Sequence, residues 1–233
     1  MSQPALVCLP FAGAGASFYR PWSSDAFRSE LRVVPLQLPG RERRIDEVPL
    51  REVSAAVDDL VGQLPGALDG AARVALFGHS LGAVLAYELA ARLTATPGVE
   101  VARLFVSGSP PPDCPRKRRA TGLPDDEFLA RVAEFAGFSH AALDAAEIRE
   151  LVLPTLRADI QMHEEYRSGV RDPLPVPVTA LRGTGDRLVD AGQAMGWAKF
   201  TGRDFGYAEL PGGHMYLVES SAPLLRLIER AVR

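Results

Sequence analysis

The chain reads Val74-Ala75-Leu76-Phe77-Gly78-His79-Ser80-Leu81-Gly82 at the point where an apolar run gives way to an alanine-rich one, Ala83 to Leu93. This order of residue types predicts a strand, a tight turn and a helix, with Ser80 at the tip of the turn. Such a turn strains the serine backbone and crowds its neighbours, and a glycine two residues away on each side relieves the crowding. We therefore predict a nucleophile elbow that exposes the Ser80 hydroxyl at the end of a sheet; the alternative is an ordinary strand-to-helix turn.

Short apolar runs alternate with helical patterns on both sides of this segment. The other expected strands are Ala5–Leu9, Arg32–Leu38, Leu104–Val106, Val178–Leu181 and Phe205–Leu210. Helical segments are expected over Phe18 to Glu30 and over Val53 to Leu64. The alternation predicts an α/β fold with a mostly parallel central sheet and helices on both faces. Right-handed crossovers then place the loops that follow the strands at one edge of the sheet.

The alternation is interrupted between Ser109 and Pro177. Two helical segments are expected there, Asp125 to Ala136 and Ala145 to Tyr166, and two acidic residues at the start of the first suit a helix N-terminus. We predict a single domain over residues 1–233, with a helical lid insertion over approximately residues 110–176. The alternative is that these helices cover the sheet like any others.

Composition narrows the class of protein. The chain has 233 residues, 47% hydrophobic and 24% charged, which is typical of one globular domain. Its net charge of −3 gives no reason to expect a nucleic acid or an anionic membrane as partner. Because there are only two cysteines, Cys8 in an expected strand and Cys114 in a proline-rich loop, we expect no disulfide framework and a cytoplasmic location. We also expect a monomer, no signal peptide and no membrane span.

A serine nucleophile needs a base, and histidine is the usual one because its pKa lies near neutrality. His214 follows the expected strand Phe205–Leu210 directly, in a loop at the edge that also carries the elbow, and we predict that it is the base. His79 lies inside the elbow and is expected to be structural. His163 lies in a polar helix and is expected at the surface or in the lid, and His140 lies between two helical segments.

The base in turn needs an acid that fixes its tautomer and stabilises the imidazolium. Asp186 follows the strand Val178–Leu181 and is our candidate. The chain order Ser80, Asp186, His214 is the order typical of the α/β-hydrolase arrangement. Asp113 is the alternative acid, because it follows the strand after the elbow.

An oxyanion formed at the serine needs two hydrogen-bond donors. One is expected to be the backbone N–H of Leu81, the residue after the nucleophile. The other is expected from the loop after the first strand, with Ala12 as the candidate and Phe11 as the alternative; a glycine-rich loop can also simply turn the chain. A further turn carries Arg41, and with Arg43 and Arg44 it could steer an anionic ligand into the cleft or form ordinary solvated surface.

These residues together resemble the type II thioesterases that accompany modular polyketide synthases and nonribosomal peptide synthetases. The matching segments run over nearly the whole chain: Leu9–Gly13, Leu38–Arg43, Gly78–Gly82, Leu153–Asp159, Gly185-Asp186 and Gly213-His214. The Pro-Gly-Arg turn and the Leu-Arg-Ala-Asp stretch separate this family from generic esterases better than the elbow does. Two residues depart from the family pattern: Ala14 stands where a second glycine is expected, and Met215 where an aromatic is commoner.

The resemblance implies hydrolysis of acyl groups from the phosphopantetheine arm of an acyl or peptidyl carrier protein, which clears stalled units from the synthase. It implies no metal and no organic cofactor, since the substrate itself carries the phosphopantetheine. Carrier proteins are acidic, so a basic run is a candidate docking patch, although it also suits a solvated loop: Arg116, Lys117, Arg118 and Arg119. The alternatives are a chain-terminating fatty-acyl thioesterase, a carboxylesterase for small oxygen esters, and a non-catalytic hydrolase-fold protein that binds a carrier.

Overall fold

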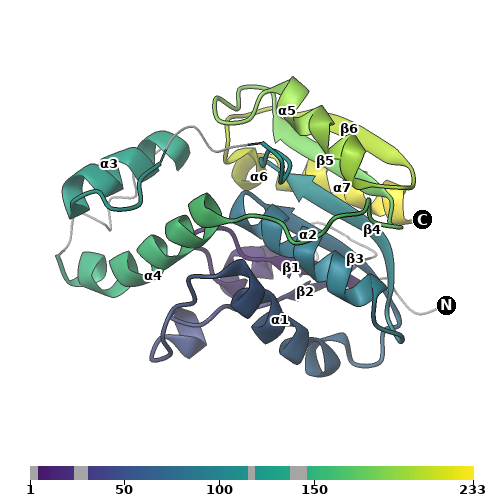
Figure 1. Ribbon diagram of the computed structural model, residues 1–233, viewed down its shortest axis with the longest axis horizontal. Helices are drawn as coiled ribbons and strands as arrows, with labels where there is room; N and C mark the ends of the chain where they lie inside the picture. The colour runs from purple at the N-terminus through teal and green to yellow at the C-terminus, as the bar shows by residue number, and fades with distance from the viewer. Residues whose placement is uncertain (1–4, 24–30, 115–118, 137–145) are drawn as a thin grey trace.

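The computed structural model describes residues 5–23, 31–114, 119–136 and 146–233. Within these residues, six strands form one sheet in the order β2-β1-β3-β4-β5-β6, and every neighbouring pair is parallel. The strands are β1 (Ala5–Leu9), β2 (Arg32–Pro35), β3 (Arg73–His79), β4 (Glu100–Ser107), β5 (Val178–Gly183) and β6 (Phe205–Leu210). The predicted α/β fold with a mostly parallel sheet is confirmed (Figure 1).

Two apolar clusters cover the two faces of the sheet, and β1 contributes to both. Its residues Ala5, Val7 and Leu9 belong to one cluster, whereas Leu6 and Cys8 belong to the other. Side chains of a strand alternate between faces, so a central strand of a parallel sheet is apolar throughout. This is why the first apolar run of the sequence shows no polar alternation.

The first cluster includes residues of α1 (Val53–Leu68), α2 (Leu81–Thr94), α5 (Ala191–Met195) and the 3₁₀ helix η4 (Gly196–Phe200). The second includes residues of the 3₁₀ helix η1 (Ala16–Ser23), α6 (Tyr216–Glu219) and α7 (Ser221–Val232). A short 3₁₀ helix, η2 (Glu42–Arg44), lies between β2 and α1. The sheet is therefore covered on both faces, as the sequence predicts.

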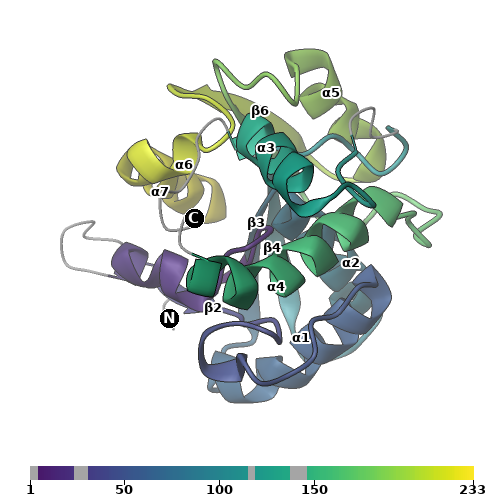
Figure 2. The ribbon, with the colours of Figure 1, turned by 90° about the vertical axis from the view of Figure 1, so that its left-hand side faces the viewer.

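Two further helices, α3 (Asp125–Ala136) and α4 (Ala146–Glu165), separate β4 from β5 in the chain. They lie beyond the carboxyl ends of the strands, on the side that faces the viewer in Figure 2. A small apolar cluster joins them, with Phe128 of α3 packed with Leu156 and Ile160 of α4. The placement agrees with an insertion between two strands, and its role as a lid stays a prediction.

Several elements differ from the sequence-based expectation. The segment from Ala16 to Ser23 is a 3₁₀ helix that contains Pro21, and residues 24–30 of the expected helix lie outside the described part. The strand β2 ends at Pro35 and not at Leu38, and the Leu36 N–H makes one more hydrogen bond to the Cys8 carbonyl of β1. The helices α6 and α7, which follow β6, were not expected. No helix of the described residues is long and apolar enough to cross a membrane.

Candidate active site

Ser80 joins β3 to α2 in a strained backbone conformation. Its φ of 53° and ψ of −115° lie outside the ordinary range of a residue with a side chain. The Ser80 N–H donates to the Ser107 carbonyl of β4 at 2.8 Å, and the side chain does not cap α2. A Cβ on Gly78 would overlap the carbonyl of Gly82, so the turn requires glycine there. The hydroxyl is partly exposed, and this is the geometry of a nucleophile elbow.

The start of α2 packs against the loop that follows β1. A Cβ on Gly82 would lie 2.6 Å from the Leu9 carbonyl oxygen and 3.0 Å from that of Pro10. Glycine therefore lets the helix approach the loop backbone. Because of this contact, the N-terminus of α2 and the loop that holds Ala12 are neighbours.

The predicted base and acid are in direct contact. His214 Nδ1 lies 2.9 Å from Asp186 Oδ2, and the two side chains are 9% and 0% exposed. The loops that carry them are joined by two backbone hydrogen bonds, from Thr184 N–H to the Leu210 carbonyl and from Gly185 N–H to the Gly212 carbonyl. Adjacent strands β5 and β6 thus deliver Asp186 and His214 to the same point of the sheet edge.

The Asp186 carboxylate is held in its charged form. Burial alone would raise its pKa, but the hydrogen bond with His214 and the two backbone N–H groups of Leu188 and Val189 outweigh burial and leave the pKa below its ordinary value. Both N–H groups donate to Oδ1, at 2.8 and 3.2 Å, while Oδ2 faces the imidazole. Each oxygen of the carboxylate therefore has its own partners.

The other aspartates do not occupy this position. Asp113 is half-exposed and lies 3.7 Å from Lys199 in a surface ion pair. Asp190 is the N-cap of α5, where it forms a capping box with Gln193. The structure thus places Asp186, and not Asp113, beside the candidate base.

His214 also lies next to the elbow. The ring centroids of His79 and His214 are 4.8 Å apart, and both rings line Gly108, where a Cβ would lie 3.2 Å from His214 Cε1. His79 is fully buried, and burial together with the neighbouring His214 lowers its pKa well below the ordinary value. Its Nδ1 is 2.9 Å from the Ser107 hydroxyl, which in turn is 2.7 Å from the Tyr216 hydroxyl. We predicted a structural role for His79, but we did not predict its contact with His214.

Two backbone donors flank the elbow. The N–H of Leu81 is in the first turn of α2, where N–H groups have no partner within the helix. In the loop after β1, Ala14 N–H donates to the Phe11 carbonyl at 2.9 Å and Gly13 N–H donates to Asp159 Oδ2 at 2.8 Å. These two N–H groups are engaged, which leaves Ala12 as the donor candidate from this loop, with Phe11 as the alternative.

The arginines after β2 do not form a steering patch. Arg41 is buried and pairs with Asp159 through two contacts of 2.7 Å. Arg44 binds Glu47 and Asp59. The hypothesis that these two arginines attract an anionic ligand is therefore wrong, because their charges are already paired; Arg43 is exposed.

Of the candidate docking run Arg116–Arg119, the structure describes only Arg119. Arg116, Lys117 and Arg118 lie outside the described residues, as does His140. The exposed Arg119 lies 3.5 Å from Glu164. His163, expected at the surface or in the lid, is buried on α4, so the surface alternative is wrong.

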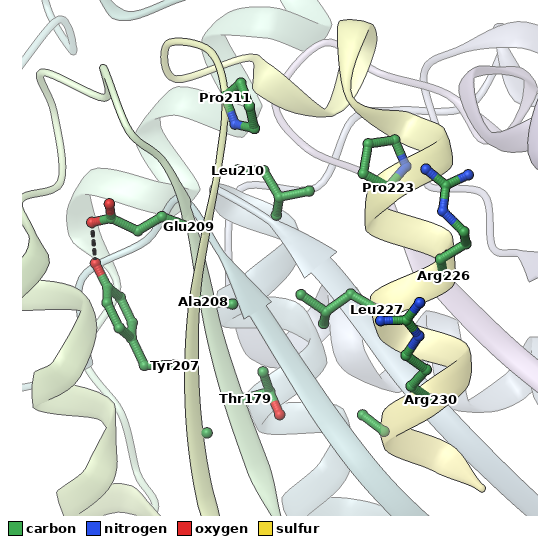
Figure 3. Close-up of a pocket in the computed structure, with 12 residues that line it drawn as sticks. Thr179, Tyr207, Ala208, Glu209, Leu210, Pro211, Pro223, Arg226, Leu227 and Arg230 are labelled. Carbon is green, nitrogen blue, oxygen red and sulfur yellow. Dashed lines mark hydrogen bonds between the residues drawn. The ribbon is translucent and has the colours of Figure 1, made fainter.

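A groove of about 590 Å³ lies between β6 and α7 (Figure 3). Its floor includes Thr179 and Ala208, and its wall includes Leu227, Arg226 and Arg230. None of Ser80, Asp186 and His214 lines it. The groove is therefore separate from the three candidate catalytic residues. Among the described residues there is also no group of three or more His, Cys, Asp or Glu side chains placed to hold a metal ion.

Comparisons with known proteins agree with this geometry. Residues 4–232 match the Thioesterase domain family. The chain is 33% identical to the gramicidin S biosynthesis protein GrsT of Aneurinibacillus migulanus over 229 residues, 98% of this chain and 88% of that protein. It is 35% identical to thioesterase PikA5 of Streptomyces venezuelae over 217 residues, 93% and 76% of the two chains.

Solved structures give the same result. The type II thioesterase BorB from the borrelidin biosynthetic cluster superposes with a TM-score of 0.87 at 34% identity, covering 100% of this chain and 94% of that one. The thioesterase RedJ from the prodiginine pathway of Streptomyces coelicolor superposes with a TM-score of 0.89 at 32% identity, covering 99% and 91%. Similarity thus extends over the full length of the chain and includes the helices between β4 and β5.

Proposed function

This chain belongs to the type II thioesterases of polyketide and nonribosomal peptide biosynthesis, and we propose that its substrate is an acyl group on the phosphopantetheine arm of an acyl or peptidyl carrier protein. Hydrolysis of that thioester frees the carrier thiol. A carrier blocked by a stalled or wrong unit is thereby returned to the synthase. The same chemistry underlies the editing role that the family implies.

The observation that supports this proposal best is the contact between His214 and Asp186 beside the strained elbow of Ser80. The imidazole is 2.9 Å from a buried carboxylate, and its ring lies against the residue that precedes the serine. A hydroxyl becomes a useful nucleophile only beside such a base. The carboxylate holds the proton on Nδ1, so that Nε2 is free to accept another.

We propose the following reaction. His214 removes the proton of the Ser80 hydroxyl as its oxygen attacks the thioester carbonyl, and the negative charge develops on the carbonyl oxygen. The N–H groups of Leu81 and Ala12 stabilise that charge, which is typically worth about 3 kcal/mol per donor. The pantetheine thiol leaves with the proton from His214, and the acyl group remains on Ser80. His214 then activates a water molecule, which releases the free acid and regenerates the serine.

The reaction as written uses only side chains, backbone N–H groups and water. We propose that no metal or organic cofactor takes part. Prolonged dialysis against EDTA should therefore leave kcat unchanged, and a loss restored by added metal would contradict this. We also propose that the protein acts as a monomer in the cytoplasm, which sedimentation at working concentration and cell fractionation would test.

The helices α3 and α4 are the proposed lid, because they lie beyond the strand ends that carry Ser80, Asp186 and His214 (Figure 2). The run Arg116–Arg119 precedes them and is the proposed carrier contact. Reversal of these charges to glutamate should raise KM for an acyl-carrier protein and spare a small thioester. An equal effect on both substrates would remove the docking proposal.

One comparison tests the substrate class. The same acyl group is presented on a carrier protein, on a small thiol such as N-acetylcysteamine, and as an oxygen ester. We expect kcat/KM to fall in that order. A preference for the oxygen ester would favour a carboxylesterase, and a preference for long acyl chains in a chain-length series would favour a chain-terminating fatty-acyl thioesterase.

A further inference from the structure

We infer that Arg41 and Asp159 are positioning residues of the oxyanion hole. Together they hold the turn Phe11–Ala14 so that the N–H of Ala12 stays beside that of Leu81. The inference rests on the proposed function, in which these two N–H groups bind the developing oxyanion. It assigns a role to two sequence motifs, Pro-Gly-Arg and Leu-Arg-Ala-Asp, that the proposed reaction does not otherwise use.

Arg41 and Asp159 form a buried ion pair with two parallel hydrogen bonds. Arg41 Nη1 and Nη2 each lie 2.7 Å from one oxygen of Asp159, and the two side chains are 7% and 0% exposed. A planar guanidinium and a carboxylate in this arrangement fix each other in both position and orientation. The pair therefore joins the segment after β2 to helix α4 rigidly.

The same two side chains bind the turn on both sides of its glycine. Asp159 Oδ2 accepts the Gly13 N–H at 2.8 Å, and Arg41 Nη1 donates to the Ala14 carbonyl at 3.0 Å. Gly13 has a φ of +76°, and Ala14 N–H closes the turn onto the Phe11 carbonyl. Such a turn has several alternative backbone conformations open to it, because glycine restricts φ so little. The ion pair selects one of them.

A purely structural role explains this arrangement poorly. Burying two charges costs so much desolvation that such a pair adds little net stability compared with apolar side chains. Helix α4 is also held by other contacts: Thr155 donates to the Gly40 carbonyl, and Glu164 accepts the N–H groups of Ala120 and Thr121. Just after the helix, the Tyr166 hydroxyl donates to Glu88. Asp159 adds to these contacts a hydrogen bond with the loop that carries Ala12.

We expect a substitution of Asp159 to weaken the stabilisation of the transition state more than it weakens substrate binding. Each hydrogen-bond partner given for the Asp159 carboxylate is a donor, and Arg41 faces both oxygens. An amide in its place therefore turns its NH₂ toward Arg41 in either orientation, and at the Oδ2 position toward Gly13 as well. The turn would then shift, and the Ala12 N–H would move from the position where the oxyanion forms. A displaced donor costs less than a deleted one, so we expect kcat to fall by about 10- to 100-fold.

The experiment measures kcat and KM for variants of the whole enzyme, with a small acyl thioester varied in concentration up to saturation. Asp159→Asn should lower kcat by about 10- to 100-fold with KM within about three-fold of wild type. Arg41→Lys keeps the charge but loses the fork, and it should give the same pattern. Because both residues act through one turn, the double variant should be no slower than the slower single variant. A boronic acid that forms a tetrahedral adduct with Ser80 should bind more weakly by a similar factor.

Glu164→Gln is the matched control. It alters another buried carboxylate of α4 that also accepts backbone N–H groups, but these belong to residues 120 and 121. We expect it to keep kcat within about two-fold, even if its melting temperature falls as far as that of Asp159→Asn.

The inference is overturned if both Asp159→Asn and Arg41→Lys keep kcat, if only KM rises, or if Glu164→Gln loses as much kcat as they do. Should Asp159→Asn fail to fold, Arg41→Lys alone decides by the same criteria. A wild-type enzyme without thioesterase activity would refute the proposed function itself, whereas an active wild type with unchanged variants would refute only the positioning role.

Discussion

The sharpest prediction concerns the substitution Asp186→Asn. Oδ1 of this residue accepts the N–H groups of Leu188 and Val189, so in the variant the amide oxygen must stay at that position. The NH₂ group then faces His214 Nδ1, which lies 2.9 Å from Oδ2. An NH₂ donor can face only an unprotonated Nδ1, so the proton of the imidazole moves to Nε2. In that tautomer the ring cannot accept the proton of Ser80.

The structure thus predicts a loss of chemistry with little change in folding. Trapping a catalytic histidine in the wrong tautomer costs about 10⁴ in kcat in serine hydrolases that use this arrangement. A 10⁴-fold loss of kcat corresponds to an increase of about 5.4 kcal/mol in the activation free energy. KM for a small acyl thioester should change little, because the tautomer does not alter the acyl pocket. The assay is steady-state hydrolysis of an N-acetylcysteamine thioester at pH 7.

Asp113→Asn is the matched control, because Asp113 is the alternative acid and, among the residues that the structure describes, forms its ion pair with Lys199. We expect it to keep kcat within about two-fold. The reasoning is refuted if Asp186→Asn retains more than about a tenth of wild-type kcat, or if Asp113→Asn shows the larger loss.

Three further predictions follow from the same site. Ser80→Ala should lower kcat by about 10⁴ or more with an unchanged circular dichroism spectrum, and near-normal turnover would refute the nucleophile assignment. Gly78→Ala should prevent the elbow from closing, because its Cβ would overlap the Gly82 carbonyl; a soluble, active variant would contradict this. The folded state lowers the pKa of Asp186, so its contribution to stability is present above its unfolded pKa of about 3.9 and is lost as the pH falls through the folded value. Urea denaturation from pH 7 downward should therefore show the stability difference between wild type and Asp186→Asn shrinking below about pH 4, and a gap that widens there would contradict the sign.

The sequence predicted the parts of the molecule that depend on neighbours in the chain. The elbow is one, because its two glycines and its serine lie within five residues and the strain is local. The strand β6 and the loop of His214 are another, because the run Phe205–Leu210 is followed directly by Pro-Gly-Gly, which ends a strand. Parallel topology then follows from the alternation of strands and helices alone.

Contacts between segments that are far apart in the chain could not be predicted from the sequence. Arg41 and Asp159 are 118 residues apart, and with 26 basic and 29 acidic residues in the chain no pairing between them is marked by sequence. Both residues were noticed as parts of family motifs, but a motif does not say what it touches. The surface alternative for His163 was wrong for a related reason: a polar helix suggested solvent, whereas α4 buries that side chain.

Rapid quenching with an acyl-phosphopantetheinyl carrier protein, followed by peptide mass spectrometry, tests whether Ser80 carries the acyl group. We expect an acyl ester on Ser80 that forms within the first turnover and disappears as the free acid is released. Steady release of acid without any acylated Ser80, or an adduct on a different residue, would contradict it.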